Sequence, residues 1–532
     1  MSPARPLLVL VAILVGGYLM GQRVFAGSDP TSRVLLFLGA MAIFVVPLLL
    51  KSWRYTLVAA VIYMTFSGFL NHLAGYHTVT RSLKFALVAI VLFHWLVSEV
   101  LVRWREGKSL HYPLFFPIAV FASYSVLQMF NPNWSHLSNG LKAGLAGMVM
   151  HVLPMGLVFV GYDFVTERRQ ITAFLVLVVA LTTFMAAFGI YQHQLGMEAV
   201  SSWGQSFGTT VERELTWGQS YQSVMKPLSF AQDAGAASSF YTLGILFTCI
   251  LFLRPDLHGQ QAVALSVAFV LLVVSLFLTQ VRLGFVGACV GVCVLGIFGN
   301  RGRALFLFAL IGGGFLITYF LYEPGVRDVL VHRYEILGSP VEAAVESRGV
   351  QADMIFVVAR QTPFGAGIGR AGPGAYLGVE GERPLLLSPG ENYYANLVIE
   401  SGILGLLLML LIFGTILRRA WDLYVRELVD PVDRIYCLGA ACMLGVVMLA
   451  GMAGPVFYTT PMNVFFWFLT GLLFKLPSLA GTEGAGADAL AKPEGPPGFR
   501  GIRPRPLPVG LHRFGPDPLP RRVGAARDDL RR

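Results

Sequence analysis

Charged residues are scarce in this sequence. Only 13% of its 532 residues are Asp, Glu, Lys or Arg, whereas 55% are hydrophobic. A soluble protein of this length carries about 25% charged residues, and a single soluble core cannot bury so much apolar surface. The composition therefore excludes an ordinary soluble domain and predicts a chain whose apolar surface faces lipid.

Cysteine is scarce as well, with five residues in the whole chain. All five lie inside apolar runs, their number is odd, and none has the spacing of metal ligands. These cysteines are therefore expected to be small core residues. The segments predicted to lie outside the membrane contain no Asp-rich motif, so we predict no metal site and no other cofactor.

The apolar residues form long runs that are separated by short charged stretches. A window of about 19 residues gives about fourteen spanning helices, which predicts an all-α polytopic membrane protein. The predicted spans are 6–22, 33–50, 55–72, 83–102, 112–130, 141–160, 170–192, 236–253, 261–279, 283–299, 303–321, 394–417, 434–452 and 460–476. Only Gln280, Val281 and Arg282 separate two of these spans, which predicts a tight helical hairpin.

The basic residues predict the orientation of the chain. With the N-terminus inside, the inner short loops hold 15 Lys and Arg residues and the outer short segments hold eight. The inner set is Arg5, Lys51, Arg54, Arg103, Arg105, Lys108, Arg168, Arg169, Arg254, Arg301, Arg303, Arg418, Arg419, Arg426 and Arg434, and the outer set is Arg23, Arg33, Arg81, Lys84, Lys142, Arg213, Lys226 and Arg282. Both termini are therefore predicted to be cytoplasmic. The net charge of +10 follows this loop pattern, so no nucleic-acid partner is expected.

Two long segments, 193–235 and 322–393, are predicted on the outer face. Long loops usually carry function. The second is expected to contain a helix over about 340–361, followed by a glycine-rich turn in "PFGAGIGRAGPGAY". The membrane domain is predicted to end at residue 476. The tail over 477–532 is rich in Pro, Gly and Arg and is predicted to be disordered.

Several polar residues near the predicted outer face are candidates for chemistry. Arg282 lies in the hairpin turn, where it either snorkels to lipid head groups or binds phosphate through its planar fork. Glu391 and Asn392 lead into a spanning helix, where capping of the helix is the alternative to a functional role. Glu400 follows inside the apolar stretch, at a depth where a carboxylate needs a partner or a wet cavity. The second outer loop contains Arg348, Arg360 and Arg370, but its acidic residues outnumber its arginines, so a plain charged surface is the alternative.

Four sequence features together resemble the O-antigen ligase and polymerase family, whose members join lipid-linked bacterial glycans outside the inner membrane. They are "LTQVRLGFVGA", Arg348 followed by "RQTPFGAGIG", "ENYYANLVIESGILG", and "KPLSFAQDAGAASSF". The resemblance is strongest over roughly 225–475, and "QMFNPNWSHLSNGLKAGLAG" resembles exopolysaccharide polymerases. The chain departs from the ligase branch of the family at Glu391, where that branch has a histidine.

The resemblance implies a GT-C-like, metal-independent, inverting glycosyltransferase. Its donor would be an undecaprenyl-diphosphate-linked oligosaccharide, its acceptor a glycan, and its product an O-antigen or exopolysaccharide polymer made on the periplasmic side of the bacterial inner membrane. A ligase that transfers glycan to a lipid A core is the first alternative, and a flippase for lipid-linked glycan is the second. A chain-length regulator and a flippase are possible partners.

The resemblance also assigns roles to particular residues. The catalytic candidates are Glu391, Arg282 and Arg348, with the two arginines on the diphosphate and Glu391 as a base or acceptor-orienting group. The candidates for substrate binding are Arg360, Arg370, Lys226, Asn392 and Tyr394.

Overall fold

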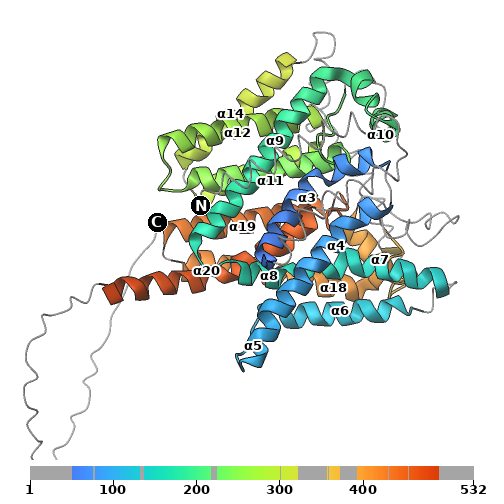
Figure 1. Cartoon of the computed structure of the whole chain (residues 1–532), viewed down its shortest axis with the longest axis vertical. Helices are drawn as coiled ribbons and strands as arrows, with labels where there is room; N and C mark the ends of the chain where they lie inside the picture. Colours follow the sequence, from blue (N-terminus) through green and yellow to red (C-terminus); the bar gives the residue numbers. More distant parts are fainter. Residues whose placement is uncertain are drawn as a thin grey trace, which may run out of the picture. The chain divides into compact units, whose positions relative to one another are not determined.

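The structure is a computed structural model. It describes residues 51–75, 78–131, 137–216, 225–299, 301–321, 356–357, 359–371, 392–428, 430–452, 454–459 and 461–490. Every regular element in these ranges is helical, as the sequence predicts (Figure 1). The chain divides into two compact units, Met1–Glu483 and Gly484–Arg532. The description below concerns the first unit, and only its last helix continues into the second.

The helices follow one another in this order along the described part of the chain. They are α3 (Trp53–Leu73), α4 (Thr78–Trp95), the π-helical turn η1 (Leu96–Val100), α5 (Leu101–Arg105), α6 (Phe115–Met129), α7 (Leu137–Met155), α8 (Leu157–Phe164), α9 (Arg168–Ser201), α10 (Gln205–Thr216), α11 (Ala234–Leu253), α12 (Gly259–Thr279), α13 (Arg282–Phe298), α14 (Arg301–Leu321), α18 (Tyr393–Asp422), the π-helical turn η3 (Leu423–Glu427), α19 (Pro431–Ala450) and α20 (Met462–Leu490).

The predicted spans from 55–72 onward all coincide with helices. Nine helical segments are long and apolar enough to cross a membrane, counted over the described ranges, and three shorter apolar helices are α6, α13 and Leu305–Leu321. The first two predicted spans, 6–22 and 33–50, lie outside the described residues. The polytopic all-α fold is therefore confirmed, and the total of about fourteen helices stays a prediction.

The predicted hairpin between α12 and α13 is present. Gln280 adopts a left-handed conformation with φ of 56°, and the hydroxyl of Thr279 accepts a hydrogen bond from the backbone N–H of Val281 at 3.3 Å. These two local features reverse the chain direction within the three residues, 280–282, that separate the two predicted spans.

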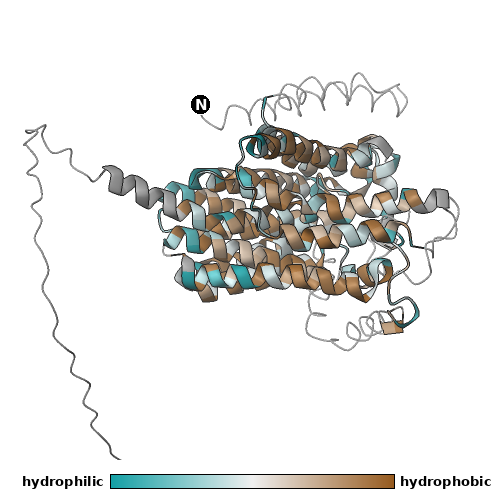
Figure 2. Ribbon diagram, turned by 90° about the horizontal axis from the view of Figure 1, so that it is seen from below, coloured by the Kyte–Doolittle hydropathy of each residue, from teal (hydrophilic) through white to brown (hydrophobic). Residues whose placement is uncertain are grey.

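Helix α11 lies at the centre of the unit. It packs against α9, α12, α13 and α19, and 89% of its most apolar stretch is buried. Such burial fits a helix that is apolar on all sides. By contrast, only 22% of the corresponding stretch in Thr80–Arg105 is buried, and Phe93 is 68% exposed. Hydrophobic residues run along the length of the helices (Figure 2), so this exposed surface is suited to lipid.

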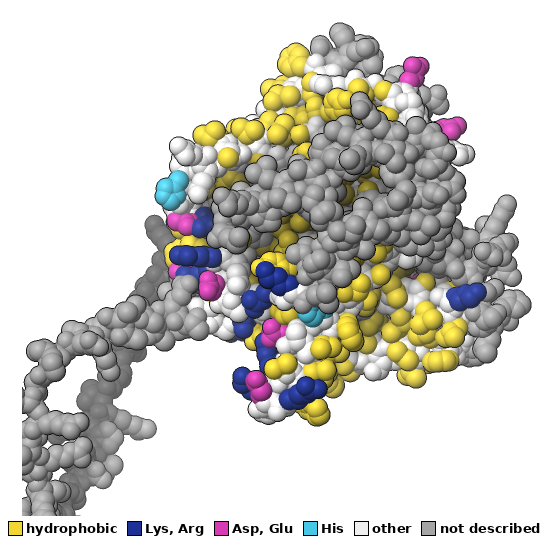
Figure 3. All heavy atoms as spheres, in the orientation of Figure 1, with side chains coloured by type: hydrophobic (Ala, Val, Ile, Leu, Met, Phe, Trp, Pro, Cys, Tyr) yellow, Lys and Arg dark blue, Asp and Glu magenta, His cyan; other side chains and the backbone are white. Residues whose placement is uncertain are grey.

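The charged side chains gather at one end of the helices. There Asp163, in the last turn of α8, accepts hydrogen bonds from Arg103, Tyr112 and Trp95 at 2.9, 2.7 and 3.0 Å. A few residues further on, Arg168 at the start of α9 pairs with Asp430 and Asp433 at 2.9 and 2.7 Å. Figure 3 shows Lys, Arg, Asp and Glu collected mainly on the side where α5 lies. This is the end that the sequence predicts to be cytoplasmic.

The two long outer segments are only partly described. In the first, α9 continues beyond the predicted end at 192 to Ser201, with a break at Gly196, and α10 follows. In the second, residues 356, 357 and 359–361 are helical, while the rest of the helix predicted over 340–361 lies outside the described residues. Helix α20 extends to Leu490, past the predicted domain boundary at 476, and 491–532 of the predicted disordered tail are also outside the description.

Candidate functional site

Helix α18 is interrupted at Gly402, where φ is 66° and ψ is −170°. The break leaves the carbonyls of Ile399 and Glu400 without their usual partners in the helix. The glycine-rich turn supplies new donors, because the N–H groups of Ala366 and Gly367 bond to these carbonyls at 2.7 and 3.1 Å. In return, the N–H of Ile403 donates to Pro363 at 3.1 Å. Every one of these backbone groups is thus satisfied at a depth where water is scarce.

The turn over 362–371 needs glycine where it approaches other backbones. A Cβ on Gly402 would lie 2.2 Å from the carbonyl oxygen of Pro363, and a Cβ on Gly369 would lie 1.9 Å from that of Ala143 on α7. Both glycines also have positive φ. The predicted glycine-rich turn is therefore confirmed over 363–371, and 372–376 lie outside the described residues. Glycines of the turn and of α18 allow close packing of the turn against α7 and α18.

Side chains of α6 hold the same turn from another side. Gln128 donates to the carbonyl of Phe364 at 2.7 Å, and Asn131 donates to that of Gly365 at 3.1 Å. Tyr124 donates to the carbonyl of Ser401 at 2.8 Å, beside the break in α18. Helices α6, α7 and α18, which lie next to one another in Figure 1, therefore form a frame around the turn.

A buried acidic residue lies beneath the turn. Oε2 of Glu400 is 2.6 Å from Nε2 of His151 on α7 and accepts a hydrogen bond from the hydroxyl of Tyr458 at 3.3 Å. Its other oxygen, Oε1, accepts a bond from the N–H of Ala371 at 3.0 Å. Burial, and then the neighbouring Glu400, raise the pKa of Tyr458 well above its usual value, so this hydroxyl remains a donor. Glu400 thus has the partner that the sequence required at this depth.

Arg282 is the first residue of α13. The first amide groups of a helix have no partner inside it, and the helix dipole disfavours a cation at this end. Nε of Arg282 is buried, and none of the described residues accepts a hydrogen bond from it. Arg282 is half-buried, and an arginine at the start of a helix, where the first amide groups lack partners inside the helix, is an arrangement that favours an anion. Binding of phosphate by Arg282 stays a prediction, as does the alternative of snorkelling.

Lys226 lies in the irregular segment that precedes α11. The segment is fixed to α9 because the N–H of Ser229 donates to Gln192 at 2.5 Å and Nδ1 of His193 lies 2.9 Å from the carbonyl of Met225. The segment is also fixed to α3 by a bond from the N–H of Phe69 to the carbonyl of Phe230 at 3.0 Å. Lys226 is therefore presented from a well-anchored stretch rather than from a free loop.

The remaining candidates lie close to the turn and to the start of α18. Arg360 is exposed and precedes the turn, whereas Arg370 is half-buried within it. The side chain of Asn392 accepts bonds from the N–H groups of Tyr394 and Ala395 at 3.0 and 3.1 Å, so it caps α18. The hydroxyl of Tyr394 donates to Met448 at 2.6 Å. Both side chains thus have structural partners, and binding of substrate by them stays a prediction.

The start of α13 and the start of α18 are close to each other in space. Both lie at the end of α19, where the N–H of Tyr393 donates to Gly451 at 2.9 Å and the side chain of Leu283 lies against Gly454. Lys226, Arg282, Arg360 and Arg370 therefore share the end of the unit opposite to Asp163, although they come from different helices. Arg348 and Glu391 lie outside the described residues, so their positions stay predictions.

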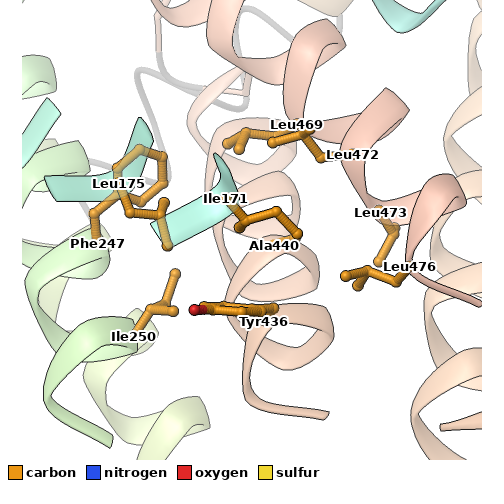
Figure 4. Close-up of a pocket in the computed structure, with 10 residues that line it drawn as sticks. All are labelled: Ile171, Leu175, Phe247, Ile250, Tyr436, Ala440, Leu469, Leu472, Leu473 and Leu476. Carbon is orange, nitrogen blue, oxygen red and sulfur yellow. The ribbon is translucent and has the colours of Figure 1, made fainter. Parts of the chain in front are cut away.

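Two recesses in the unit lie away from these residues. One, of about 20 Å³, is lined by Ile171, Leu175, Phe247, Ile250, Tyr436, Ala440, Leu469, Leu472, Leu473 and Leu476 (Figure 4). It is apolar and has room for about one water molecule, so it suits neither sugar nor phosphate. The other, of about 450 Å³, is lined in part by Arg303, Tyr424 and Arg434 and lies at the charged end.

The described ranges contain no group of three His, Cys, Asp or Glu side chains that is placed to hold a metal ion. Metal independence nevertheless stays a prediction, because a catalytic ion is also bound by substrate phosphates in many enzymes.

These features belong to a polytopic membrane protein that carries several basic residues and a glycine-rich turn at one end of its helices. The family model described as O-antigen ligase matches residues 267–410, from within α12 to within α18. The match includes Arg282, the glycine-rich turn and Glu400, so over these residues the chain is similar to the O-antigen ligase family. No curated protein matches the chain.

The sequence analysis missed His151. This histidine stands alone in the apolar run "GLAGMVMHVLPMGLVFVG", with no other polar residue at a spacing that points to a partner. The available signal was Glu400 itself, because a carboxylate in an apolar helix calls for a donor from elsewhere. Only the packing of α7 on α18 identifies that donor.

Proposed function

We propose that the protein polymerises O-antigen or exopolysaccharide repeat units on the periplasmic side of the bacterial inner membrane. The donor is an undecaprenyl-diphosphate-linked oligosaccharide, and the acceptor is a hydroxyl group of a second glycan. The observation that carries this proposal is the family match over 267–410, which places the family's region on Arg282 and the turn. The coarser activity, joining of lipid-linked glycan to an acceptor, follows from the family.

The chemistry requires stabilisation of a departing diphosphate. The acceptor oxygen forms a bond to the anomeric carbon while the bond from that carbon to the diphosphate oxygen breaks. Attack from the opposite face inverts the configuration. The acceptor proton passes to a base, for which Glu391 is the candidate, and the lipid diphosphate leaves as an anion. Cations and amide groups that face this anion lower the barrier.

Arg282 is the residue best suited to contact the diphosphate. Its fork matches two phosphate oxygens, its Nε has no acceptor among the described residues, and it is the first residue of α13, where helix amide groups lack partners inside the helix. Lys226, Arg360 and Arg370 at the same end, with Arg348 from the second outer segment, would add positive charge.

Two alternatives remain distinct from polymerisation. A ligase would transfer the glycan to a lipid A core, and the family description favours it. Glu391 stands where the ligase branch has a histidine, which favours the polymerase. A flippase would move the lipid-linked glycan without forming a bond. The family match argues against a flippase.

Reconstitution tests the proposal. Purified full-length protein in vesicles is supplied with undecaprenyl-diphosphate-linked oligosaccharide, and glycan length and released lipid diphosphate are measured. Polymerisation predicts a ladder of lengths with release of lipid diphosphate. Transfer only to added lipid A core would identify the ligase, and movement of intact donor across the bilayer would identify the flippase. Either of these results would overturn the polymerase proposal.

A further inference from the structure

The pair formed by His151 and Glu400 has no role in the chemistry described so far. Their side chains are 1% and 0% exposed, so neither touches a substrate in this arrangement. Glu400 is the eighth residue of α18, roughly 10 Å along the helix axis from its start. Polar groups at such a depth are costly, and replacing a buried pair of ionisable groups by apolar residues of similar volume is often neutral or stabilising. Simple packing of α7 on α18 therefore does not explain the pair.

One hydrogen bond of Glu400 is made with the glycine-rich turn rather than with another helix. Its Oε1 accepts from the N–H of Ala371 at 3.0 Å, and the residue before Ala371 is Arg370. Because the peptide unit is planar, fixing the N–H of Ala371 also fixes the carbonyl and the Cα atom of Arg370. The carboxyl group of Glu400 thus fixes the backbone at the end of the turn, next to Arg370.

His151 holds the carboxylate in place for this bond. Ala143, Gly147 and His151 are spaced four residues apart, so they lie on one face of α7. Gly147 and Ala143 are in close contact with Gly369 of the turn, while His151 lies 2.6 Å from Glu400. The hydroxyl of Tyr458 donates to the same oxygen, Oε2. One face of α7 therefore supports both the turn and the carboxylate that fixes it.

We propose that His151 and Glu400 are positioning residues that hold Arg370 against the diphosphate of the lipid-linked donor. The inference rests on the proposed function and assigns to Arg370 a contact that depends on a buried pair of side chains. Arg370 touches the donor, and the pair acts only through the turn. Loss of the pair should therefore have the same effect on the donor as loss of Arg370.

A double-mutant cycle measures this dependence. One charge-assisted contact corresponds to roughly a 10- to 100-fold change in affinity, so Arg370→Ala and Glu400→Leu, which removes both acceptor oxygens, should each raise the KM for the donor by about that factor. If Glu400 acts through Arg370, the double variant should be no worse than Arg370→Ala alone. Independent losses that multiply in the double variant would overturn the proposal.

A second buried pair provides the control. Asp433 is 0% exposed and pairs with Arg168 at 2.7 Å, at the opposite end of the unit. Asp433→Asn should lower thermal stability while leaving the KM for the donor unchanged. An equal rise in KM for Asp433→Asn would mean that any damaged buried pair produces the effect, and it would overturn the positioning role.

A physical readout separates this inference from the proposed function. A spin label attached through Arg370→Cys in the full-length protein should become more mobile when Glu400→Leu is added. Unchanged mobility overturns the positioning role whether or not the protein transfers glycan. Failure of the wild-type protein to consume any lipid-linked donor would overturn the proposed function instead. If Glu400→Leu does not accumulate in membranes, Tyr458→Phe serves instead, because it removes one hydrogen bond to Oε2 of Glu400. Tyr458→Phe should also increase the mobility of the label, but by less.

Discussion

Nε2 of His151 on α7 lies 2.6 Å from Oε2 of Glu400 on α18, although 249 residues separate them in the sequence. This contact fixes α7 and α18 relative to each other below the glycine-rich turn. The turn lies next to this contact. Its backbone groups form hydrogen bonds with side chains of α6 and with the backbone of α18. A polar site at one end of the helices is therefore built on a buried framework.

Replacement of Arg282 should disrupt glycan synthesis. Removing one preorganised donor to a developing anion costs about 100-fold or more in rate, so Arg282→Ala should abolish long chains on glycan gels. Arg282→Lys keeps the charge without the planar fork and should give an intermediate profile. Arg348→Ala should resemble Arg282→Ala.

The control for Arg282 is Arg418→Ala. The side chain of Arg418 is 87% exposed and lies near the opposite end of α18. This variant should keep the wild-type distribution of chain lengths. Wild-type chain lengths in Arg282→Ala, at normal protein levels in the membrane, would contradict the assigned role.

Gly402→Ala should destabilise the protein. A methyl group at this position would lie 2.2 Å from the carbonyl oxygen of Pro363, and φ of 66° is unfavourable for alanine. Strain of this kind costs about 1–3 kcal/mol in addition to the clash. The measurement is the midpoint of thermal unfolding in detergent. Gly414→Ala is the matched control on the same helix, because nothing lies within 4 Å of its Cβ position, and it should be neutral or slightly stabilising. Equal melting of the two variants would refute the explanation.

Asp163→Ala should also lower stability, but without changing donor binding. Asp163 is buried and accepts bonds from Arg103, Tyr112 and Trp95. Removing the acid from such a pair costs about 3–5 kcal/mol when both partners are buried, and the expected loss is near the lower value because Arg103 is 33% exposed. Glu106→Ala serves for comparison, since its pair with Lys108 is exposed and contributes under about 1 kcal/mol. Equal unfolding temperatures for Asp163→Ala and Glu106→Ala would contradict this role of Asp163.

The predicted orientation can be measured by cysteine labelling. Gln205 at the start of α10 and Gln260 at the start of α12 are both exposed, and they lie at opposite ends of the unit. A membrane-impermeant maleimide should label Gln205→Cys in intact spheroplasts and Gln260→Cys only after permeabilisation. All native cysteines lie within helices, so background labelling should be low. The reverse pattern would place the cationic site in the cytoplasm.

Removal of divalent cations should leave activity unchanged. The outer segments contain no Asp-rich motif, and the arginines are expected to neutralise the diphosphate. Treatment of the reconstituted protein with a chelator should therefore not alter glycan length or rate. Loss of activity that Mg²⁺ or Mn²⁺ restores would show that a metal takes part.

The sequence by itself determined the class of the protein and much of its topology. Apolar runs long enough to cross a bilayer must form helices there, because lipid offers no partners for backbone groups. Every predicted span within the described ranges is accordingly a helix. Local rules also sufficed for the hairpin at Gln280 and for a glycine-rich turn before α18, since both depend on residues close together in the chain.

Tertiary structure decided what surrounds the site. No periodicity relates His151 to Glu400, Gln128 to Phe364, or Asp163 to Arg103, because each pair joins helices that are distant in sequence. The extension of α9 beyond 192 likewise depends on contacts with the segment before α11. Hydropathy determines that a helix spans the membrane but not which helices become neighbours. That choice comes from close contacts such as Gly369 against Ala143, and it is what places a buried carboxylate beneath Arg370.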